Sequence, residues 1–345
     1  MNLKEVATRA GVSTATVSRV LSNTIQVKPT TRALVMKVVT ELNYHPNLQA
    51  RTLAGGKSKT LGMIVSNLEN PFFLDIHRTL ERDAHQHGYE LVIANTDYSP
   101  AQLASAVRMM LGRKVDGLAI IVSEMTDELV AELANSKLPL VLYDVPSPHE
   151  NIINIHINYR RGIERVVDYL HSLGHVRFAF IGHHSMLGPT GEREKAFIEA
   201  VSRFAPVSKW FVVTNQDGLE GGRKAAREVL ASGFCPTALV CVNDLMAIGA
   251  LRELRDQGIR VPHDMSLTGF DNIELSEFCY PSLTTVHLPR ERIGHLVFDH
   301  LVPEAARIKP NGREIVIDPE FIVRESTGPA RARPKANPNT PRKAT

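Results

Sequence analysis

Aromatic, carboxylate and amide side chains follow the strand-like runs of this sequence, at positions where they could bind a ligand. Phe72 and Phe73 follow the first run, Asp144 ends the fourth, and Asn243 and Asp271 end two later ones. Aromatic rings cover the C–H face of a polyhydroxylated ligand, while carboxylates and amides hydrogen-bond to its hydroxyls. Any one of these residues alone is more often an N-cap or a packed ring. As a set they predict a binding pocket rather than a catalytic centre.

Motifs that would indicate an enzyme or a metal centre do not occur. The turn at 66–71 contains no glycine, so the G-x-G-x-x-G of dinucleotide-binding folds is missing, and no P-loop, G-x-S-x-G or H-E-x-x-H is found. The His183-His184 pair has no acidic partner nearby in sequence. The three cysteines show no CxxC spacing; they are Cys235, Cys241 and Cys279. We therefore expect a protein that is not an enzyme and uses no cofactor, metal or disulfide.

The pocket residues must be positioned by alternating strands and helices that begin at Thr60. The strand-like runs cover 61–66, 90–96, 117–122 and 138–144, then 177–182, 210–214, 238–243 and 265–271. Such alternation is typical of parallel sheets, which bind ligands beyond the carboxyl ends of their strands. The sequence therefore predicts an α/β core of two parallel-sheet subdomains with a ligand in the crevice between them.

Charge is divided unevenly along the chain. Residues 1–59 contain nine Lys or Arg and two acidic residues, whereas residues 60–328 contain 26 basic and 35 acidic ones. A basic head on an acidic body indicates that the head contacts a polyanion. The chain begins without the apolar run of a signal peptide and has no apolar run of about 18 residues, so we expect a cytoplasmic, nucleoid-associated bacterial protein without membrane contact.

The basic head is predicted to form three short helices. Apolar residues at i, i+3, i+4 and i+7 form a stripe in the first helix, which ends at Gly11; they are Leu3, Val6, Ala7 and Ala10. Ser13 is a suitable N-cap for the second helix, and Pro29 suits the first position of the third. The buried positions predicted for these two helices are Val17, Val20, Leu21, Leu34, Val35, Val38, Val39 and Leu42. The order predicts a helix-turn-helix with a supporting helix.

The outer face of the second helix carries Thr14, Ala15, Ser18 and Arg19. Short polar side chains allow a helix to lie deep in the DNA major groove, where an arginine can reach guanine O6 and N7. We expect Thr14 and Ala15 nearest to the base edges and Ser18 at a phosphate. The alternative is an ordinary solvated face of a helical hairpin.

A further short helix is predicted at 48–54. Asn47 can cap it and the glycines at 55–56 end it after about two turns, which is too short for a helix that is stable alone. Leu53 would be exposed on this helix and could wedge into the minor groove, while Lys57 could contact a phosphate. A flexible linker is the alternative.

The segments LKEVATRAGVSTATVSRVLSN and LNYHPNLQARTLAGGKS resemble the DNA-binding head of the lactose/galactose-repressor (LacI/GalR) family, and the similarity continues to about Gly328. The resemblance implies a sequence-specific transcriptional regulator, most often a repressor, controlled by a small-molecule effector. It implies base reading by Thr14, Ala15 and Arg19 and minor-groove contact by Ala50 and Leu53. The motifs ENPFF, GEREKAF, CVNDLMAIGAL and TGFDN also resemble the family, and they imply effector contacts at Phe72, Phe73, Asp144, Arg193, Asn243 and Asp271.

Departures from the family pattern concern the ligand. Leu187 and Pro189 stand where some relatives have Arg and Thr contacts, and Gln216 stands where relatives often have an aromatic residue. The effector therefore cannot be taken over from a particular relative. We expect the effector to be a sugar or sugar acid rather than a purine.

The domain boundaries follow from these patterns. The predicted parts are a helix-turn-helix domain at 1–46, a hinge helix and linker at 47–59, an effector-binding and dimerisation core at 60–328 and a disordered basic tail at 329–345. The first subdomain is expected at about 60–158 plus 289–317 and the second at about 159–288 plus 318–328. The tail has four prolines and no leucine heptads, so it should not form a tetramerising helical bundle.

A regulator of this kind is expected to be a homodimer on a pseudo-palindromic operator of double-stranded DNA, because two-fold symmetric sites need two heads. Effector binding should form or melt the hinge helices, with a coupling free energy of about 1–3 kcal/mol. A secreted sugar-binding protein would need a signal sequence, an enzyme would need catalytic residues, and an architectural DNA-binding protein would need no pocket. A regulator that ignores small molecules and responds to a protein partner remains the alternative.

Overall fold

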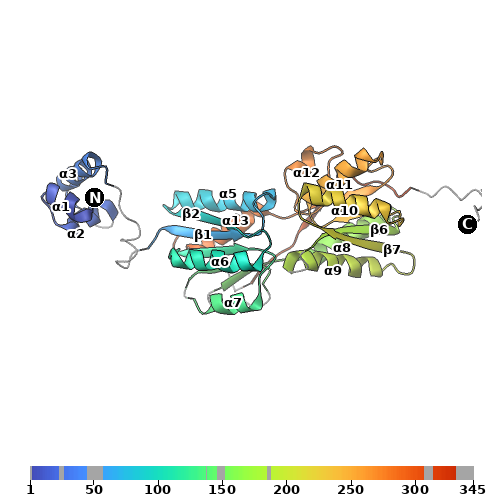
Figure 1. Cartoon of the computed structure of the whole chain (residues 1–345), viewed down its shortest axis with the longest axis horizontal. Coiled ribbons are helices and arrows are strands. Elements are labelled where there is room, and N and C mark those ends of the chain that lie inside the picture. Colours follow the sequence, from blue (N-terminus) through green and yellow to red (C-terminus); the bar gives the residue numbers. More distant parts are fainter. Residues whose placement is uncertain are drawn as a thin grey trace, which may run out of the picture. The chain divides into compact units, whose positions relative to one another are not determined.

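A computed structural model of the chain describes residues 2–22, 27–44, 57–136, 138–145, 152–184, 188–306 and 314–331 (Figure 1). The chain forms two compact units, Met1–Ser58 and Lys59–Thr345. Several positions discussed above lie outside the described residues, namely Asn47, Ala50, Leu53, Leu187 and the tail beyond Arg331.

The first unit contains three helices around a small apolar core. They are α1 (Leu3–Arg9), α2 (Thr14–Ser22) and α3 (Pro29–Glu41). Gly11 has a φ of 63°, in the left-handed region, and allows the sharp turn after α1. Ser13 Oγ accepts a hydrogen bond from the backbone N–H of Thr16 at 3.1 Å, which is the N-cap contact predicted for α2. The core consists of Val6, Ala7, Ala10, Val17, Val20, Val35, Val38, Leu42 and Tyr44, with Val39 and Leu21 packed against it.

One residue predicted for this core lies outside it. Leu34 of α3 is 46% exposed, whereas Val35 and Val38 are buried. Leu34 lies about 100° round the helix from Val35, and the apolar core of this unit, which contains Val35 and Val38, does not extend to it. The prediction for Leu34 was wrong for this reason.

The first sheet of the second unit has six parallel strands in the order β11-β5-β4-β3-β1-β2. The strands are β1 (Thr60–Val65), β2 (Glu90–Asn95), β3 (Gly117–Ile121), β4 (Leu140–Tyr143), β5 (Ile152–Ile157) and β11 (Glu314–Ile317). Its helices are α5 (Pro71–Gln86), α13 (Arg290–Leu301), α6 (Pro100–Gly112) and α7 (Asp127–Ala134). Met63 of β1 packs in the cluster that contains α5 and α13, and Ile64 packs in the cluster that contains α6 and α7. The alternation shows that helices cover both faces of the sheet.

The second sheet has four parallel strands in the order β7-β6-β8-β9. They are β6 (Arg177–His183), β7 (Lys209–Asn215), β8 (Ala238–Cys241) and β9 (Ser266–Thr268). In this part of the chain α8 packs with α9 and α10 packs with α11. The helices are α8 (Tyr159–Ser172), α9 (Gly188–Ser202), α10 (Leu219–Ala231), α11 (Asp244–Asp256) and α12 (Leu275–Phe278). Strands β10 (Thr285–His287) and β12 (Glu320–Ile322) form a separate antiparallel pair.

The chain passes between the two subdomains three times: after β5, between β10 and α13, and between β11 and β12. All eight predicted strands coincide with observed ones to within a few residues, which confirms the two parallel-sheet subdomains. Strands β10 and β12 were missed because three residues are too few to show a period. Strand β5 was missed because no described helix separates it from β4, so strand–helix alternation does not predict it.

Candidate functional site

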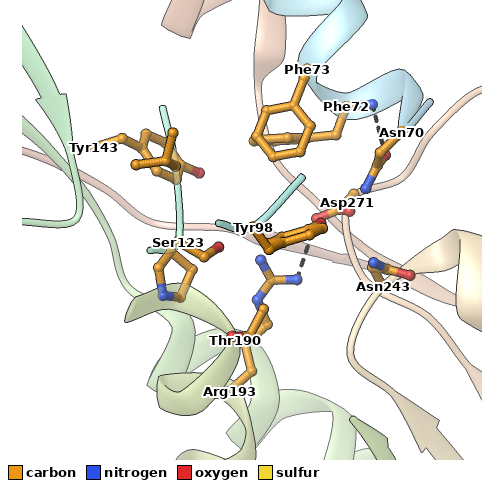
Figure 2. A pocket seen from close by; sticks show the side chains of 12 residues that line it. Asn70, Phe72, Phe73, Tyr98, Ser123, Tyr143, Thr190, Arg193, Asn243 and Asp271 are labelled. Atoms are coloured by element: carbon orange, nitrogen blue, oxygen red, sulfur yellow. Dashed lines mark hydrogen bonds and ion pairs between the residues drawn. The ribbon is translucent and has the colours of Figure 1, made fainter. Parts of the chain in front are cut away.

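The carboxyl ends of strands from both subdomains meet at a small pocket (Figure 2). Its cavity volume of about 30 Å³ leaves room for about one water molecule. It is lined by Asn70, Phe72, Phe73, Tyr98, Val122, Ser123, Tyr143, Pro189, Thr190, Arg193, Asn243 and Asp271. The structure therefore brings together five of the six predicted effector residues, and Asp144 is the exception.

The wall from the first subdomain is aromatic. Asn70 Oδ1 accepts a hydrogen bond from the backbone N–H of Phe72 at 3.0 Å and so caps α5, whose first turn carries both phenylalanines. The Phe72 and Phe73 rings meet edge to face at 5.1 Å, and Phe72 lies 6.2 Å from the ring of Tyr143. The cap at Asn70 thus fixes where these rings face the pocket.

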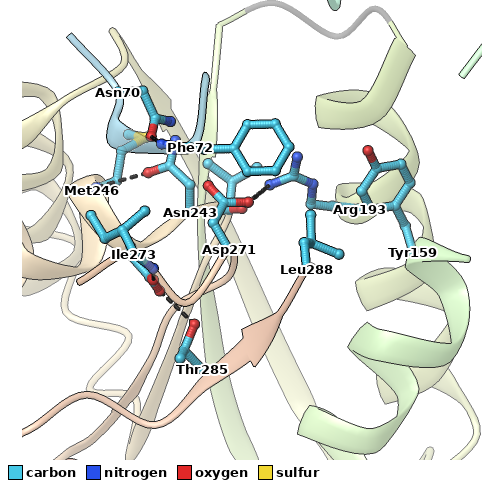
Figure 3. Close-up of polar contacts among 12 residues, drawn as sticks. Asn70, Phe72, Tyr159, Arg193, Asn243, Met246, Asp271, Ile273, Thr285 and Leu288 are labelled. Carbon is cyan, nitrogen blue, oxygen red and sulfur yellow. Dashed lines mark hydrogen bonds and ion pairs between the residues drawn. The ribbon is translucent and has the colours of Figure 1, made fainter. Parts of the chain in front are cut away.

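Arg193 of α9 is the buried cation of the pocket. Its guanidinium lies over the rings of Tyr159 and Phe270, at 4.8 and 4.7 Å from their centroids. Nη1 donates to the carbonyl of Val242 at 2.5 Å and lies 3.6 Å from Asp271 Oδ1 (Figure 3). Its Nε is buried and has no hydrogen-bond partner among the described residues. The arginine therefore retains a donor for a ligand.

Asp271 provides a buried acceptor beside Arg193. Its Oδ1 also has no hydrogen-bond partner among the described residues, and its side chain is 4% exposed. Burial raises the pKa of this carboxyl to about 6, while Arg193 and Arg290 oppose the rise. Arg290 of α13 donates to the carbonyls of Asp271 and Asn272 and pairs with Asp75 of α5 at 2.9 Å. This arginine thus joins the Asp271 loop to the other subdomain.

Asn243 has its amide orientation fixed by the protein. Oδ1 accepts a hydrogen bond from the backbone N–H of Met246 at 2.9 Å as the N-cap of α11, and Nδ2 donates to Asp217 Oδ1 at 2.7 Å. Asp217 Oδ2 also accepts hydrogen bonds from Tyr98 Oη at 2.6 Å and from Asn67 Nδ2 at 3.0 Å. These three hydrogen bonds lower the pKa of Asp217 in spite of burial, which alone would raise it. The Asp217 carboxylate therefore connects the two subdomains.

Sequence analysis missed Tyr98 and Asp217. Tyr98 and Asp217 are 119 residues apart in the chain, so no local motif links them. Gln216, which attracted attention as a departure from the family pattern, is exposed and does not line the pocket; the residue of this turn that contacts pocket side chains is Asp217. Pro189, the other described departure, does line the pocket.

Asp144 lies apart from the other predicted effector residues. It lines a neighbouring cavity of about 480 Å³, and its side chain is 0% exposed. Its carboxylate accepts hydrogen bonds from the backbone N–H of Ile157 at 2.8 Å, His156 Nδ1 at 3.0 Å and Tyr159 Oη at 2.6 Å. The hydrogen bond to Asp144 raises the pKa of His156. In this structure the Asp144 carboxylate positions protein groups and presents no open acceptor to the pocket.

The predicted DNA-reading face is solvent-exposed on α2. Its four residues are all exposed, and Val17 and Val20 of the same helix are buried on the opposite side. The four are Thr14, Ala15, Ser18 and Arg19. Lys57, from the predicted linker, is also exposed.

The described residues give no indication of a metal site or of a membrane-spanning helix. Within them no group of three or more His, Cys, Asp or Glu side chains could hold a metal ion. Across the same part of the chain no helix is both long and apolar enough to cross a membrane.

A buried pocket between two parallel-sheet subdomains, in one chain with an exposed helix-turn-helix face, defines a ligand-responsive DNA-binding regulator. The model of the family described as "Bacterial regulatory proteins, lacI family" matches residues 2–47, and that of the "Periplasmic binding protein-like domain" matches residues 167–327. The HTH-type transcriptional repressor PurR of Vibrio cholerae serotype O1 (strain M66-2) is 34% identical over 94% of this chain and 97% of its own. The chain belongs to the LacI family of transcriptional repressors, which are not enzymes.

Solved structures agree with this assignment. The lac repressor dimer bound to operator and the anti-inducer ONPF has a TM-score of 0.80 at 27% identity, covering 95% of this chain and 99% of that one. A LacI family transcriptional regulator from Enterococcus faecium with bound ribose has a TM-score of 0.69 at 26% identity, covering 79% of this chain and 100% of that one. The protein is thus a DNA-binding repressor with an effector-binding domain.

Proposed function

We propose that a sugar or sugar derivative in the pocket controls the operator affinity of this repressor. The observation that carries the proposal is the pair of buried polar atoms without hydrogen-bond partners among the described residues, Arg193 Nε and Asp271 Oδ1. A buried polar atom without a hydrogen bond costs about 1–3 kcal/mol, and a ligand that accepts from Arg193 Nε and donates to Asp271 Oδ1 would reduce that cost. The aromatic wall of Phe72 and Phe73 suits the apolar face of a sugar ring.

Thermal unfolding of the full chain tests this proposal against a panel of sugars, sugar acids, sugar phosphates and nucleobases. A ligand at 100 times its dissociation constant adds about 2.7 kcal/mol of stability, which raises the unfolding midpoint measurably. Arg193→Ala should abolish the shift. The alternative effector is a purine, favoured by the relatives named PurR, and a shift by nucleobases alone would select it. A folded protein that no compound stabilises would favour control by a protein partner.

The exposed face of α2 supports base reading by Thr14, Ala15 and Arg19, with a phosphate contact from Ser18. An operator is first selected from random DNA with the wild-type chain. Arg19→Ala should then lower the affinity for the operator about 10-fold or more and the affinity for random DNA little. The reason is that a bidentate arginine–guanine contact favours the correct base over a wrong one by about 1–3 kcal/mol. Lys57→Ala should lower the affinity for the operator and for random DNA by the same factor and reduce the salt dependence of binding. Equal losses on both DNAs for Arg19→Ala would exclude base reading.

A homodimer is the assembly that we propose for operator binding. Exposed apolar side chains cluster in sequence at α12 and just after it: Leu275 is 48%, Phe278 75% and Tyr280 88% exposed. Apolar side chains gathered in this way mark association surfaces more often than isolated ones do. Sedimentation should give a dimer, neither monomer nor tetramer, and Tyr280→Asp should shift it towards monomer. The regulator would act in the cytoplasm, where its DNA lies.

The predicted domain boundaries belong to the same proposal. The segment from 47 to 59 would act as the hinge, with Asn47 as the N-cap of its helix and Ala50 and Leu53 at the minor groove. Effector-driven movement of the two core subdomains would change the spacing of two hinges in a dimer and so change DNA affinity about 5- to 150-fold.

A further inference from the structure

Tyr98 lies in the middle of the pocket rather than at its edge. Figure 2 shows its ring between the phenylalanines and the pair of Arg193 and Asp271. With the ring in place the cavity measures about 30 Å³, which is too small for a sugar or a nucleobase. Movement of Tyr98 would make room for a ligand of that size at this position.

Contacts from the other subdomain hold the ring in place. Tyr98 Oη donates to Asp217 Oδ2 at 2.6 Å, and the ring contacts that of His183 in a tilted arrangement with centroids 4.4 Å apart. Burial and the nearby charge of Asp217 raise the pKa of Tyr98 well above its usual value, so the hydroxyl remains a donor. The hydrogen bond to a carboxylate is of the stronger, charge-assisted kind.

The backbone at this position is strained. Asp97 and Tyr98 have φ values of 48° and 58°, in the left-handed region, which is costly for a bulky residue. Strain of this kind persists only where surrounding contacts compensate for it.

We propose that Tyr98 is a removable plug that occupies the effector position of the empty repressor, and that its phenol imitates the effector: an uncharged ring with a hydrogen-bond donor directed at Asp217. The inference rests on the proposed function, because it takes the pocket to be the effector site. It narrows the ligand class to uncharged compounds, since the carboxylates of Asp217 and Asp271 would repel the negative charge of a sugar acid or sugar phosphate. Arg193, the lining cation, already lies beside Asp271.

Accessibility of the pocket to a small reagent tests the plug without a known effector. Thr190→Cys places a thiol that lines the pocket but not the neighbouring cavity. Its labelling by uncharged iodoacetamide is followed by peptide mass spectrometry in the full chain, apart from the native cysteines. Tyr98→Ala should speed labelling of Cys at position 190 by roughly tenfold or more, and Tyr98→Phe, which keeps the ring and loses its hydrogen bond, should speed it less.

Tyr169→Phe is the matched control, because it also removes a tyrosine hydroxyl with a side-chain partner, Thr327 Oγ1 at 3.4 Å, outside the pocket lining. It should leave the labelling rate unchanged. Equal rates with and without the Tyr98 ring would overturn the plug. If the alanine variant fails to fold, Tyr98→Phe decides the test, because a labelling rate equal to that of the chain with Tyr98 would show that the hydrogen bond to Asp217 does not hold the ring in the pocket and would overturn the plug.

Two probes with the same para-methylphenyl ring and different polar groups test the ligand class. In the Thr190→Cys, Tyr98→Ala chain, para-cresol should protect the thiol from labelling and para-toluate should not, because only the first is uncharged and donates a hydrogen bond. Equal protection by both would overturn the selection for an uncharged donor. Operator selection by the wild-type chain is measured separately, so a failure of the regulator function would appear there and a failure of the plug would appear in the labelling.

Discussion

The DNA-reading face of α2 and the pocket of the core use polar side chains in opposite ways. On α2 the polar residues Thr14, Ser18 and Arg19 belong to one short helix and are exposed. In the pocket Arg193 and Asp271 are buried, and they come from segments far apart in the chain. The face of α2 is thus complete within one helix, whereas the pocket exists only once the two subdomains have folded against each other.

The difference predicts different costs of substitution. An exposed side chain contributes little to folding, so changes on α2 should alter DNA binding and leave stability alone. A buried charge that loses its partner destabilises the fold by several kcal/mol. Changes in the pocket should therefore alter ligand binding and stability together.

Arg193→Met should give the largest effect. The methionine keeps an unbranched stem beside Tyr159 and Phe270 but leaves the carboxylate of Asp271 buried without its cation. We expect the free energy of unfolding at neutral pH to fall by about 3–5 kcal/mol, measured by urea denaturation.

Arg260→Met is the control for Arg193→Met. Arg260 pairs with Asp264 at 2.7 Å, but its side chain is 63% exposed. Exposed pairs contribute little, so the urea midpoint should barely change. Similar losses of unfolding free energy in the two variants would show that the buried and the exposed arginine contribute equally to stability, and would contradict the contrast.

Stability should depend on pH through the buried carboxyl of Asp271, whose pKa is raised by burial, more than through the exposed groups of the head. Its pKa of about 6 in the folded protein exceeds the ordinary value of about 3.9. The folded state therefore holds this proton more tightly than the unfolded state, and the resulting stability is complete below about pH 4 and lost as the pH rises towards 6. The loss amounts to at most about 3 kcal/mol.

Asp271→Asn removes this titration and provides the comparison. As the pH rises from about 4 to about 7, the free energy of unfolding of the wild type should fall relative to that of the variant. Asp244 also has a pKa that is raised, first by burial and then by the charge of Asp271, so its titration changes in the variant and contributes to the difference. A difference that stays constant with pH would show that Asp271 titrates normally.

The sequence predicts the fold well where structure is local. The turn at Gly11, the cap at Ser13 and the start of α3 at Pro29 each depend on one residue and its neighbours, and all three were predicted correctly. Eight of the twelve described strands were also found, because each short apolar run stands between helical stretches, whereas β5 was missed for lack of such a helix. Burial of Leu34 was predicted wrongly, because periodicity does not tell how wide the apolar side of a short helix is.

The site could be predicted only in part. Phe72, Asn243 and Asp271 were found because each follows a strand, and the carboxyl ends of parallel strands meet at one edge. The position of Asp144 at the neighbouring cavity could not be inferred, because it depends on contacts with Tyr159 and His156. Tyr98 and Asp217 also follow strands, β2 and β7, so strand position could have marked them as candidates, but their contact across the two subdomains leaves no signal in the sequence. Strand position therefore identifies candidates, and only tertiary contacts decide what each one does.

Ser13→Ala should give the smallest of these effects, within the head itself. The substitution removes the hydroxyl that accepts the backbone N–H of Thr16 in the first turn of α2. Loss of an N-cap costs about 1 kcal/mol, so amide hydrogens of α2 should exchange about fivefold faster in the full chain. The core is a separate compact unit, and its exchange should not change.

Ser18→Ala is the matched control on the same helix. Ser18 is exposed in the middle of α2, where alanine is at least as good a helix former as serine, so exchange should be unchanged or slower. Operator affinity should respond in a different pattern, since Ser18 is proposed to contact a phosphate and Ser13 to support the helix. If Ser18→Ala destabilised α2 as much as Ser13→Ala, the polar face of the head would also be held by internal contacts, and its contrast with the pocket would be lost.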